Sequence, residues 1–108
     1  MAIKKLDKGE WQRFFDRLSK DLMTSREVEY AEVRVFSPEI GAQKATSWLP
    51  LEGITYDTKD DLIDLAVPNL DHMIYHPTEI FIDEASDGVL CSMEILRRDG
   101  TKEVVELR

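Results

Sequence analysis

The spacing of apolar residues near the start of the chain predicts an amphipathic helix. Five large apolar side chains recur at intervals of three and four residues and so share one helix face. They are Trp11, Phe14, Phe15, Leu18 and Leu22. Asp7 is a favourable N-cap residue, and Glu10 completes a capping box three positions later. We therefore expect a helix from about residue 8 to about residue 23, with this face buried in the core.

Beyond residue 28 the apolar positions alternate with polar ones, which is typical of half-buried strands. The alternation is clear at Ala31, Val33 and Val35 and weaker further along the chain. The predicted strands lie near residues 30–35, 42–49, 54–56, 62–67, 79–84, 89–95 and 104–107. Asp99-Gly100, between the last two, is a strong hairpin signal.

The short connections predict antiparallel pairing, because parallel neighbours need crossovers of about a dozen residues or more. The helix face needs an apolar partner, and one face of this sheet is the only one available. We therefore predict an α+β fold. An N-terminal amphipathic helix packs on a curved, mostly antiparallel sheet of six or seven short strands, which could curl into a partial barrel. The 108 residues suit a single domain over 1–108, with a strand-rich meander over about 28–108.

The composition is acidic, with 14 Lys and Arg against 22 Asp and Glu and a net charge of −8. The charge is uneven: residues 1–26 carry a net +3 and residues 50–87 a net −9. Such a chain is repelled by nucleic acids and anionic membranes, so we expect it to contact neither directly. The single cysteine, the polar N-terminus and the absence of an apolar run near the roughly 20 residues of a membrane span favour a cytoplasmic location.

Asp71, His72 and His76 are the residues most suggestive of chemistry. Two histidines four positions apart share one face of a helix, a spacing found in metal sites. A third ligand would have to come from Asp71 or from a distant residue. Pro77 disfavours helix at His76, so we expect a short turn without a metal or any other cofactor. The turn would dock into the core through Leu70, Met73 and Ile74.

Other candidate chemistry is weak. Four aspartates suggest a calcium loop: Asp57, Asp60, Asp61 and Asp64. Leu62 and Pro68 stand where that loop needs Gly and Glu, so we expect a solvated acidic turn. Cys91 alternates with polar residues in a strand, which predicts a buried, inert thiol. The sequence therefore yields no catalytic residue and no cofactor-binding residue.

Trp48, Leu49 and Leu51 are an apolar stretch beside a turn. Such residues can form a protein-binding patch. The alternative, that Trp48 covers the core beneath the loop, is favoured because single exposed apolar residues are common on protein surfaces. The missing catalytic or cofactor motif and the uneven charge favour a non-catalytic protein-binding or accessory domain with a protein partner. The alternatives are a small metal-dependent or hydrolytic enzyme centred on Asp71, His72 and His76, and an acidic mimic of nucleic acid that uses residues 50–87. The partner and the oligomeric state stay open.

Several short motifs follow one another along nearly the whole chain. They are Glu10-Trp11 with Phe14-Phe15-Asp16, Leu49-Pro50-Leu51-Glu52-Gly53-Ile54, Leu70-Asp71-His72-Met73-Ile74 and the Asp99-Gly100 hairpin. In this order they resemble a family of short bacterial proteins of unknown function. The resemblance implies a bacterial source and a shared fold. It implies no activity, cofactor or site residue.

Overall fold

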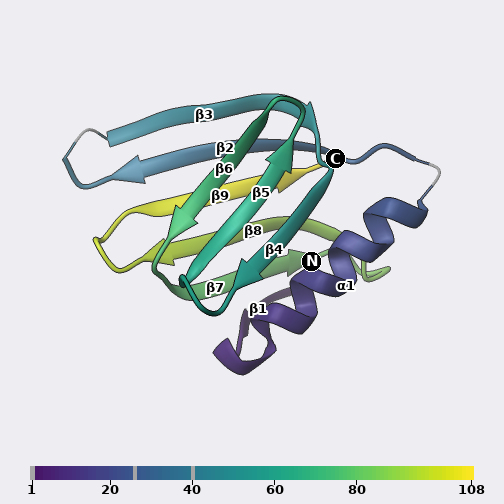
Figure 1. Cartoon of the computed structure of the whole chain (residues 1–108), viewed down its shortest axis with the longest axis horizontal. Coiled ribbons are helices and arrows are strands. Elements are labelled where there is room, and N and C mark those ends of the chain that lie inside the picture. Colours follow the sequence, from purple (N-terminus) through teal and green to yellow (C-terminus); the bar gives the residue numbers. More distant parts are fainter. Residues whose placement is uncertain (1, 26, 40) are drawn as a thin grey trace.

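The computed structural model describes residues 2–25, 27–39 and 41–108. Within them the chain begins with strand β1 (Ala2–Leu6), a 3₁₀ turn η1 (Lys8–Glu10) and helix α1 (Trp11–Thr24). Eight further strands follow: β2 (Tyr30–Ser37), β3 (Gly41–Pro50), β4 (Gly53–Asp57), β5 (Leu62–Val67), β6 (Leu70–Tyr75), β7 (Pro77–Glu84), β8 (Leu90–Arg97) and β9 (Lys102–Leu107). The prediction of an α+β fold with antiparallel strands is confirmed (Figure 1).

The strands form two antiparallel sheets. Sheet A has six strands in the order β1-β7-β8-β9-β2-β3, and sheet B has three in the order β4-β5-β6. Sheet B lies across one face of sheet A, and α1 lies beside β4 (Figure 1). Because β1 and β3 each pair with one strand only among the described residues, sheet A stays open and does not close into a barrel.

Two strands were missed by the sequence analysis. β1 is a lysine-bearing edge strand that pairs with β7 alone, and its polar composition hides it. β6 occupies the segment for which we predicted a turn, and that prediction was wrong. Asn69 adopts a left-handed conformation with φ 63°, which suits the tight connection from β5 and lets β6 pair back along it.

The core lies between the two sheets and against the start of α1. Its largest fully buried apolar side chains are Trp11, Phe15, Ile54, Ile63, Leu65, Ile74, Ile80, Ile82, Met93 and Ile95. The predicted capping position is present, since the Asp7 amide donates to Glu10 Oε1 at 3.4 Å and the Glu10 amide donates to the Asp7 carbonyl at 2.8 Å. Within the described residues, no helix is long and apolar enough to cross a membrane.

The position of α1 differs from the prediction. The helix is attached to the edge of β4, where the Ser19 hydroxyl accepts from the Ile54 amide at 2.9 Å and donates to the Ile54 carbonyl at 2.5 Å. Only Trp11 and Phe15 are fully buried. The other three residues of the predicted face are half-buried and pack at the margin of the core: Phe14, Leu18 and Leu22. The prediction that the whole face is buried was therefore wrong, because α1 lies beside sheet B instead of flat across sheet A.

Candidate functional site: a groove between the helix and the sheet

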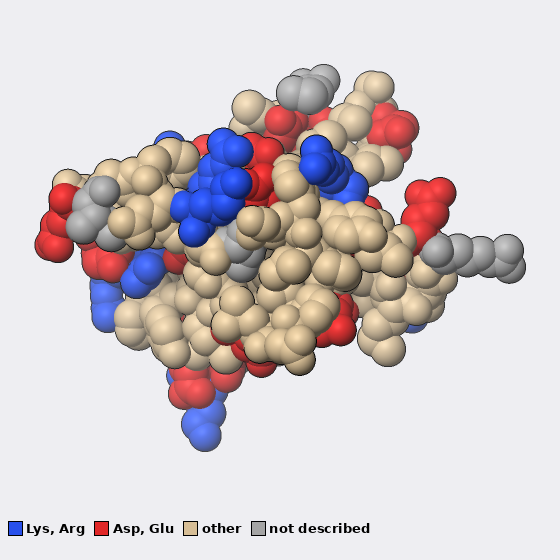
Figure 2. Space-filling model, turned by 90° about the horizontal axis from the view of Figure 1, so that it is seen from above, with Lys and Arg blue, Asp and Glu red and all other residues tan. Residues whose placement is uncertain are grey.

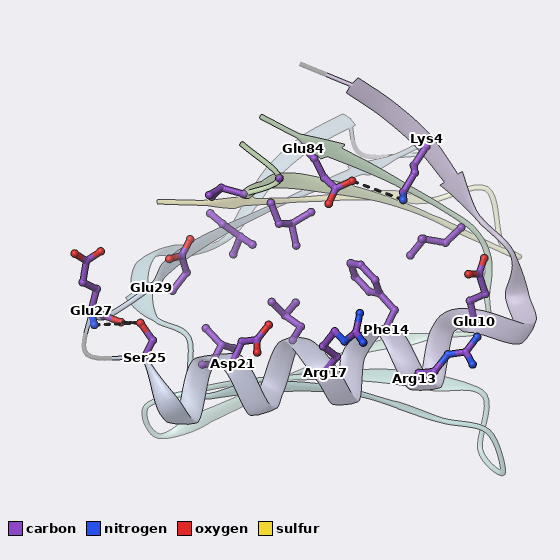
Figure 3. Close-up of a pocket in the computed structure, with 17 residues that line it drawn as sticks. Lys4, Glu10, Arg13, Phe14, Arg17, Asp21, Ser25, Glu27, Glu29 and Glu84 are labelled. Carbon is purple, nitrogen blue, oxygen red and sulfur yellow. Dashed lines mark hydrogen bonds and ion pairs between the residues drawn. The ribbon is translucent and has the colours of Figure 1, made fainter. Parts of the chain in front are cut away.

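A groove of about 830 Å³ separates α1 from sheet A (Figure 3). It exists because the Trp11 ring, which contacts Tyr56 of β4 edge-on, and Ser19, which bonds to Ile54 of β4, hold the helix toward sheet B. The helix forms one wall of the groove. The other wall comes from β1, the end of β7, β8, β9 and the segments that precede β2 and β8.

The two walls present apolar side chains to each other. The apolar lining residues are Phe14, Leu18 and Leu22 from α1, and Leu6, Val89, Leu90 and Leu107 from the opposite side. Phe14 points into the space between helix and strands (Figure 3). Its ring contacts that of Phe15 edge-on, with 5.4 Å between the ring centres. Leu6 and Leu107 are buried members of the core, whereas Val89 is 56% exposed. The groove is therefore an open continuation of the core.

Charged side chains line the rim and differ between the two ends of the groove (Figure 3). Arg13 and Lys4 lie toward one end, where Lys4 pairs with Glu84 at 3.7 Å. The acidic residues of the other end are Asp21, Glu27 and Glu29, which we call the acidic end. None of these three carboxylates forms an ion pair with another residue that the structure describes.

The acidic end has a measurable electrostatic consequence at Glu29. Burial raises the pKa of the Glu29 carboxyl, and the negative charge of Glu27 raises it further. A positively charged group placed at this end would oppose both effects. The groove therefore favours a ligand that is apolar along its length and cationic at the end near Glu29.

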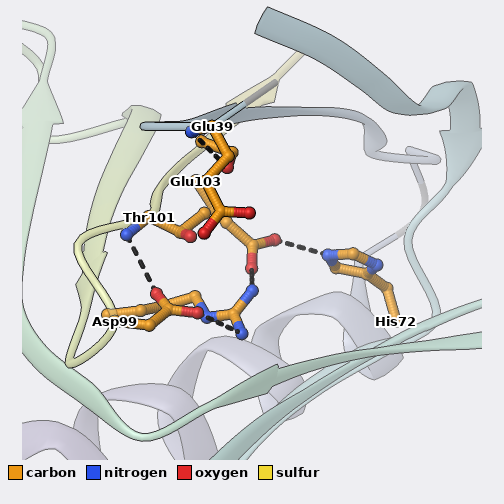
Figure 4. A network of polar contacts seen from close by, with 7 residues as sticks. Glu39, His72, Asp99, Thr101 and Glu103 are labelled. Atoms are coloured by element: carbon orange, nitrogen blue, oxygen red, sulfur yellow. Dashed lines mark hydrogen bonds and ion pairs between the residues drawn. The ribbon is translucent and has the colours of Figure 1, made fainter. Parts of the chain in front are cut away.

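His72 belongs to a network that joins the two sheets (Figure 4). It lies on β6 with Nε2 2.5 Å from Oε1 of Glu103, which is on β9 and only 1% exposed. The guanidinium of Arg97 donates to the other oxygen of Glu103 at 3.3 Å and contacts Asp99 at 3.1 Å. The His72 imidazole thus contacts a buried carboxylate.

His76 lies at a separate place, where the chain passes from sheet B to sheet A. It adopts a left-handed conformation with φ 52°, and its Nδ1 is 3.3 Å from Asp61 Oδ2. The Tyr56 hydroxyl donates to the other Asp61 oxygen at 2.7 Å. His72 and His76 therefore pair with different carboxylates. Asp71 is exposed on β6.

The helical metal-site spacing suggested by His72 and His76 is thus not realised, because the segment is a strand. Within residues 2–25, 27–39 and 41–108, no group of three or more His, Cys, Asp or Glu side chains is placed to hold a metal ion. Of the apolar residues expected to anchor the segment, Ile74 is buried, Met73 is half-buried and Leu70 is 50% exposed.

The predicted partner surface is divided between different environments. Trp48 is half-buried beneath the Arg108 guanidinium, which lies 3.8 Å from the centre of the indole ring. Leu49 packs against the core, and Leu51 is a buried member of it. Trp48 is therefore the residue of this trio that lies beside a charged surface group.

The remaining candidates differ in part from expectation. Cys91 is half-buried rather than buried, and its thiol contacts the Val89 carbonyl at 3.6 Å. In the predicted acidic turn, Asp57 and Asp60 are exposed, as expected for a solvated turn, whereas Asp61 and Asp64 are half-buried. Burial raises the pKa of Asp64, and Asp71 adds to the effect.

The groove itself was missed by sequence reasoning. The helical repeat of apolar residues indicates one wall of the groove, because Phe14, Leu18 and Leu22 are among the five residues that it selects. The opposite wall comes from residues far apart in the chain, such as Leu6 and Leu107, and no local pattern brings these together.

The fold and groove define an α+β domain with two stacked antiparallel sheets and one flanking helix. A family model described as a family of unknown function, DUF5335, matches residues 2–108, and the chain belongs to this family. The chain is also 37% identical over 109 residues to an uncharacterized protein of Aquifex aeolicus (strain VF5), covering 100% of this chain and 94% of that protein. No solved structure matches it. The resemblance to a family of unknown function is thereby confirmed.

Proposed function

We propose that this protein is a non-catalytic, cytoplasmic protein-binding domain that holds an apolar segment of a partner protein in the groove between α1 and sheet A. One observation carries the proposal. Phe14, Leu18 and Leu22 lie half-exposed along a groove of about 830 Å³ that continues the core. This volume lies within the range of about 300–1,000 Å³ that ligand sites occupy.

The apolar walls would supply most of the free energy of binding. Covering apolar surface contributes about 25 cal/mol per Å² removed from water, so a segment that fills the groove gains free energy from both walls at once. Binding sites of this kind combine apolar anchors with a charged rim that sets the orientation. The partner segment would place Lys or Arg near the acidic end and its apolar side chains against Leu18 and Leu90.

The test is selection of a displayed random peptide library on the intact wild-type chain, with counter-selection on a Leu18→Arg variant. The substitution places a charge in the apolar wall of the groove. We expect selected peptides to combine apolar positions with a terminal Lys or Arg. They should bind the wild type with micromolar Kd and the variant at least tenfold more weakly, by fluorescence anisotropy.

Gln12→Arg is the matched control, because Gln12 is an exposed residue of the same helix that does not line the groove. It adds the same charge and should leave the affinity unchanged, and circular dichroism checks that both variants are folded. Equal weakening by the two variants would contradict the proposal. If a fluorescent fatty acid binds more tightly than the peptides and displaces them, the ligand of the groove is a small amphiphile and not a partner protein.

A further inference from the structure

Strand β3 is an open edge of sheet A. It runs for ten residues and, within the described residues, pairs with β2 alone. The opposite edge, β1, has five residues of which two are lysines, and β4 has α1 beside it through Ser19. An edge strand presents a row of backbone N–H and C=O groups to any extended chain that approaches. Of the edge strands that the structure describes, β3 is the longest, and Lys44 is its one charged residue.

Basic side chains gather beside this edge although the chain as a whole is acidic. Lys44 is paired directly with Arg34 of β2 in the register of the two strands, and both are about half exposed. Like charges in facing positions repel each other. The buried carboxylate of Glu32, 3.1 Å from Lys44 and 3.7 Å from Arg34, holds the two cations together.

Glu106 of β9 faces Glu32 in the strand register, so two carboxylates lie beside these two cations. Arg108, stacked on Trp48 of β3, adds a third cation to this side of the molecule. Seen from the β3 side, Lys and Arg side chains lie at this edge with Asp or Glu side chains between them, beside a broad surface without charged residues (Figure 2). The backbone edge and the basic side chains together select for an extended segment that carries acidic residues.

We infer that the β3 edge binds an extended, acidic segment of another protein, which adds to sheet A as a further strand. Backbone hydrogen bonds to β3 would supply affinity, as in other complexes formed by strand addition. Carboxylates of the segment would contact Arg34, Lys44 and Arg108. A second copy of this chain fits the edge poorly, since it would bring two chains of net charge −8 together with their Arg34–Lys44 pairs facing.

The experiment uses a fluorescein-labelled peptide of about eight residues with alternating Val and Glu, added to the full chain. Deuterium exchange of the β3 amides should slow when the peptide binds, and the affinity should fall as salt rises because exposed charges are screened. Combined Arg34→Gln and Lys44→Gln should weaken binding at least tenfold. Lys59→Gln, which removes an exposed cation from a distant turn, is the control and should leave it unchanged.

Two altered peptides separate the contributions. The same peptide with alternate backbone nitrogens methylated cannot complete the strand ladder and should lose binding, and the Val-Lys version should also fail. Full binding of the methylated peptide or of the Val-Lys peptide would overturn the inference. So would unchanged deuterium exchange of the β3 amides at millimolar Val-Glu peptide. Concentration-dependent dimerisation that protects β3 without peptide would assign the edge to a second copy. Leu18→Arg should leave this binding intact, which separates this inference from the groove.

Discussion

Tyr56 and Asp61 show how individual side chains set the charge state of this protein. Tyr56 is buried on β4, and its hydroxyl donates to Asp61. Burial, this hydrogen bond and the negative charges of Asp61 and Asp57 raise the pKa of Tyr56 to about 12. The same hydrogen bond lowers the pKa of Asp61, and His76 and Lys8 add to that effect. The hydroxyl is therefore held neutral and the carboxyl ionised.

The raised pKa of Tyr56 predicts a loss of stability at alkaline pH. Since the unfolded value is about 10, the folded state keeps the phenol proton longer than the unfolded state does. The contribution to stability is complete below about pH 10 and is lost as the pH rises through about 12. Tyrosinate absorbance of the wild type minus that of Tyr56→Phe should show one group with a pKa of about 12. A midpoint near the ordinary value would contradict this environment.

Helix α1 contains two adjacent phenylalanines with different surroundings. Phe15 is fully buried against the core, whereas Phe14 is half-buried and faces the groove. The apolar repeat selects both residues but does not distinguish them, because it records which side chains share a face and not what covers that face.

We predict that Phe15→Ala costs about 3–5 kcal/mol of unfolding free energy, because it leaves a cavity in packed surroundings. This is a large part of the roughly 5–15 kcal/mol typical of a folded domain, so the variant should be mostly unfolded or molten at room temperature. Phe14→Ala should cost distinctly less and should still unfold cooperatively. Urea unfolding followed by circular dichroism measures both. If Phe14→Ala and Phe15→Ala lower the unfolding free energy equally, Phe14 is as well covered as Phe15 and the groove is closed in solution.

The elements with strong local signals could be predicted from the sequence. The capping residues Asp7 and Glu10 mark the start of the helical segment, and Asp99-Gly100 marks the β8–β9 hairpin, where Gly100 has φ 89°. β1 and β6 escaped prediction because both are edge strands with charged or polar residues on them. Their pairing with β7 and β5 decides their conformation, and the pairing is not local.

In the candidate site, too, the local pattern could be predicted from the sequence but the non-local contacts could not. The sequence selected His72 and His76 by their spacing, yet their partners Glu103 and Asp61 lie 31 and 15 positions away along the chain. No local pattern relates residues so far apart. Strand register, which the two-residue connection before β6 fixes, brings His72 over sheet A.

On the scale of the whole molecule, the two sheets are joined by apolar packing and by the buried network of His72, Glu103 and Arg97. One carboxylate oxygen of Glu103 contacts His72 of sheet B, and the other accepts from Arg97 of sheet A. Glu103 is therefore the centre of this network. A buried charge that loses its partner is costly, whereas an exposed ion pair contributes little. The stability of the whole fold should therefore depend on Glu103 far more than on the surface pairs.

We predict that Glu103→Gln lowers the free energy of unfolding by about 3–5 kcal/mol, because it leaves the half-buried His72 without a carboxylate and Arg97 with Asp99 alone. Glu94→Gln is the control, since its contact with Lys102 at 3.7 Å is exposed and should be worth less than about 1 kcal/mol. Urea unfolding of His72→Gln, Glu103→Gln and the double variant gives the coupling between the sheets. We expect about 0.5–3 kcal/mol of interaction energy from this cycle. Strict additivity would instead mean that apolar packing alone holds sheet B on sheet A.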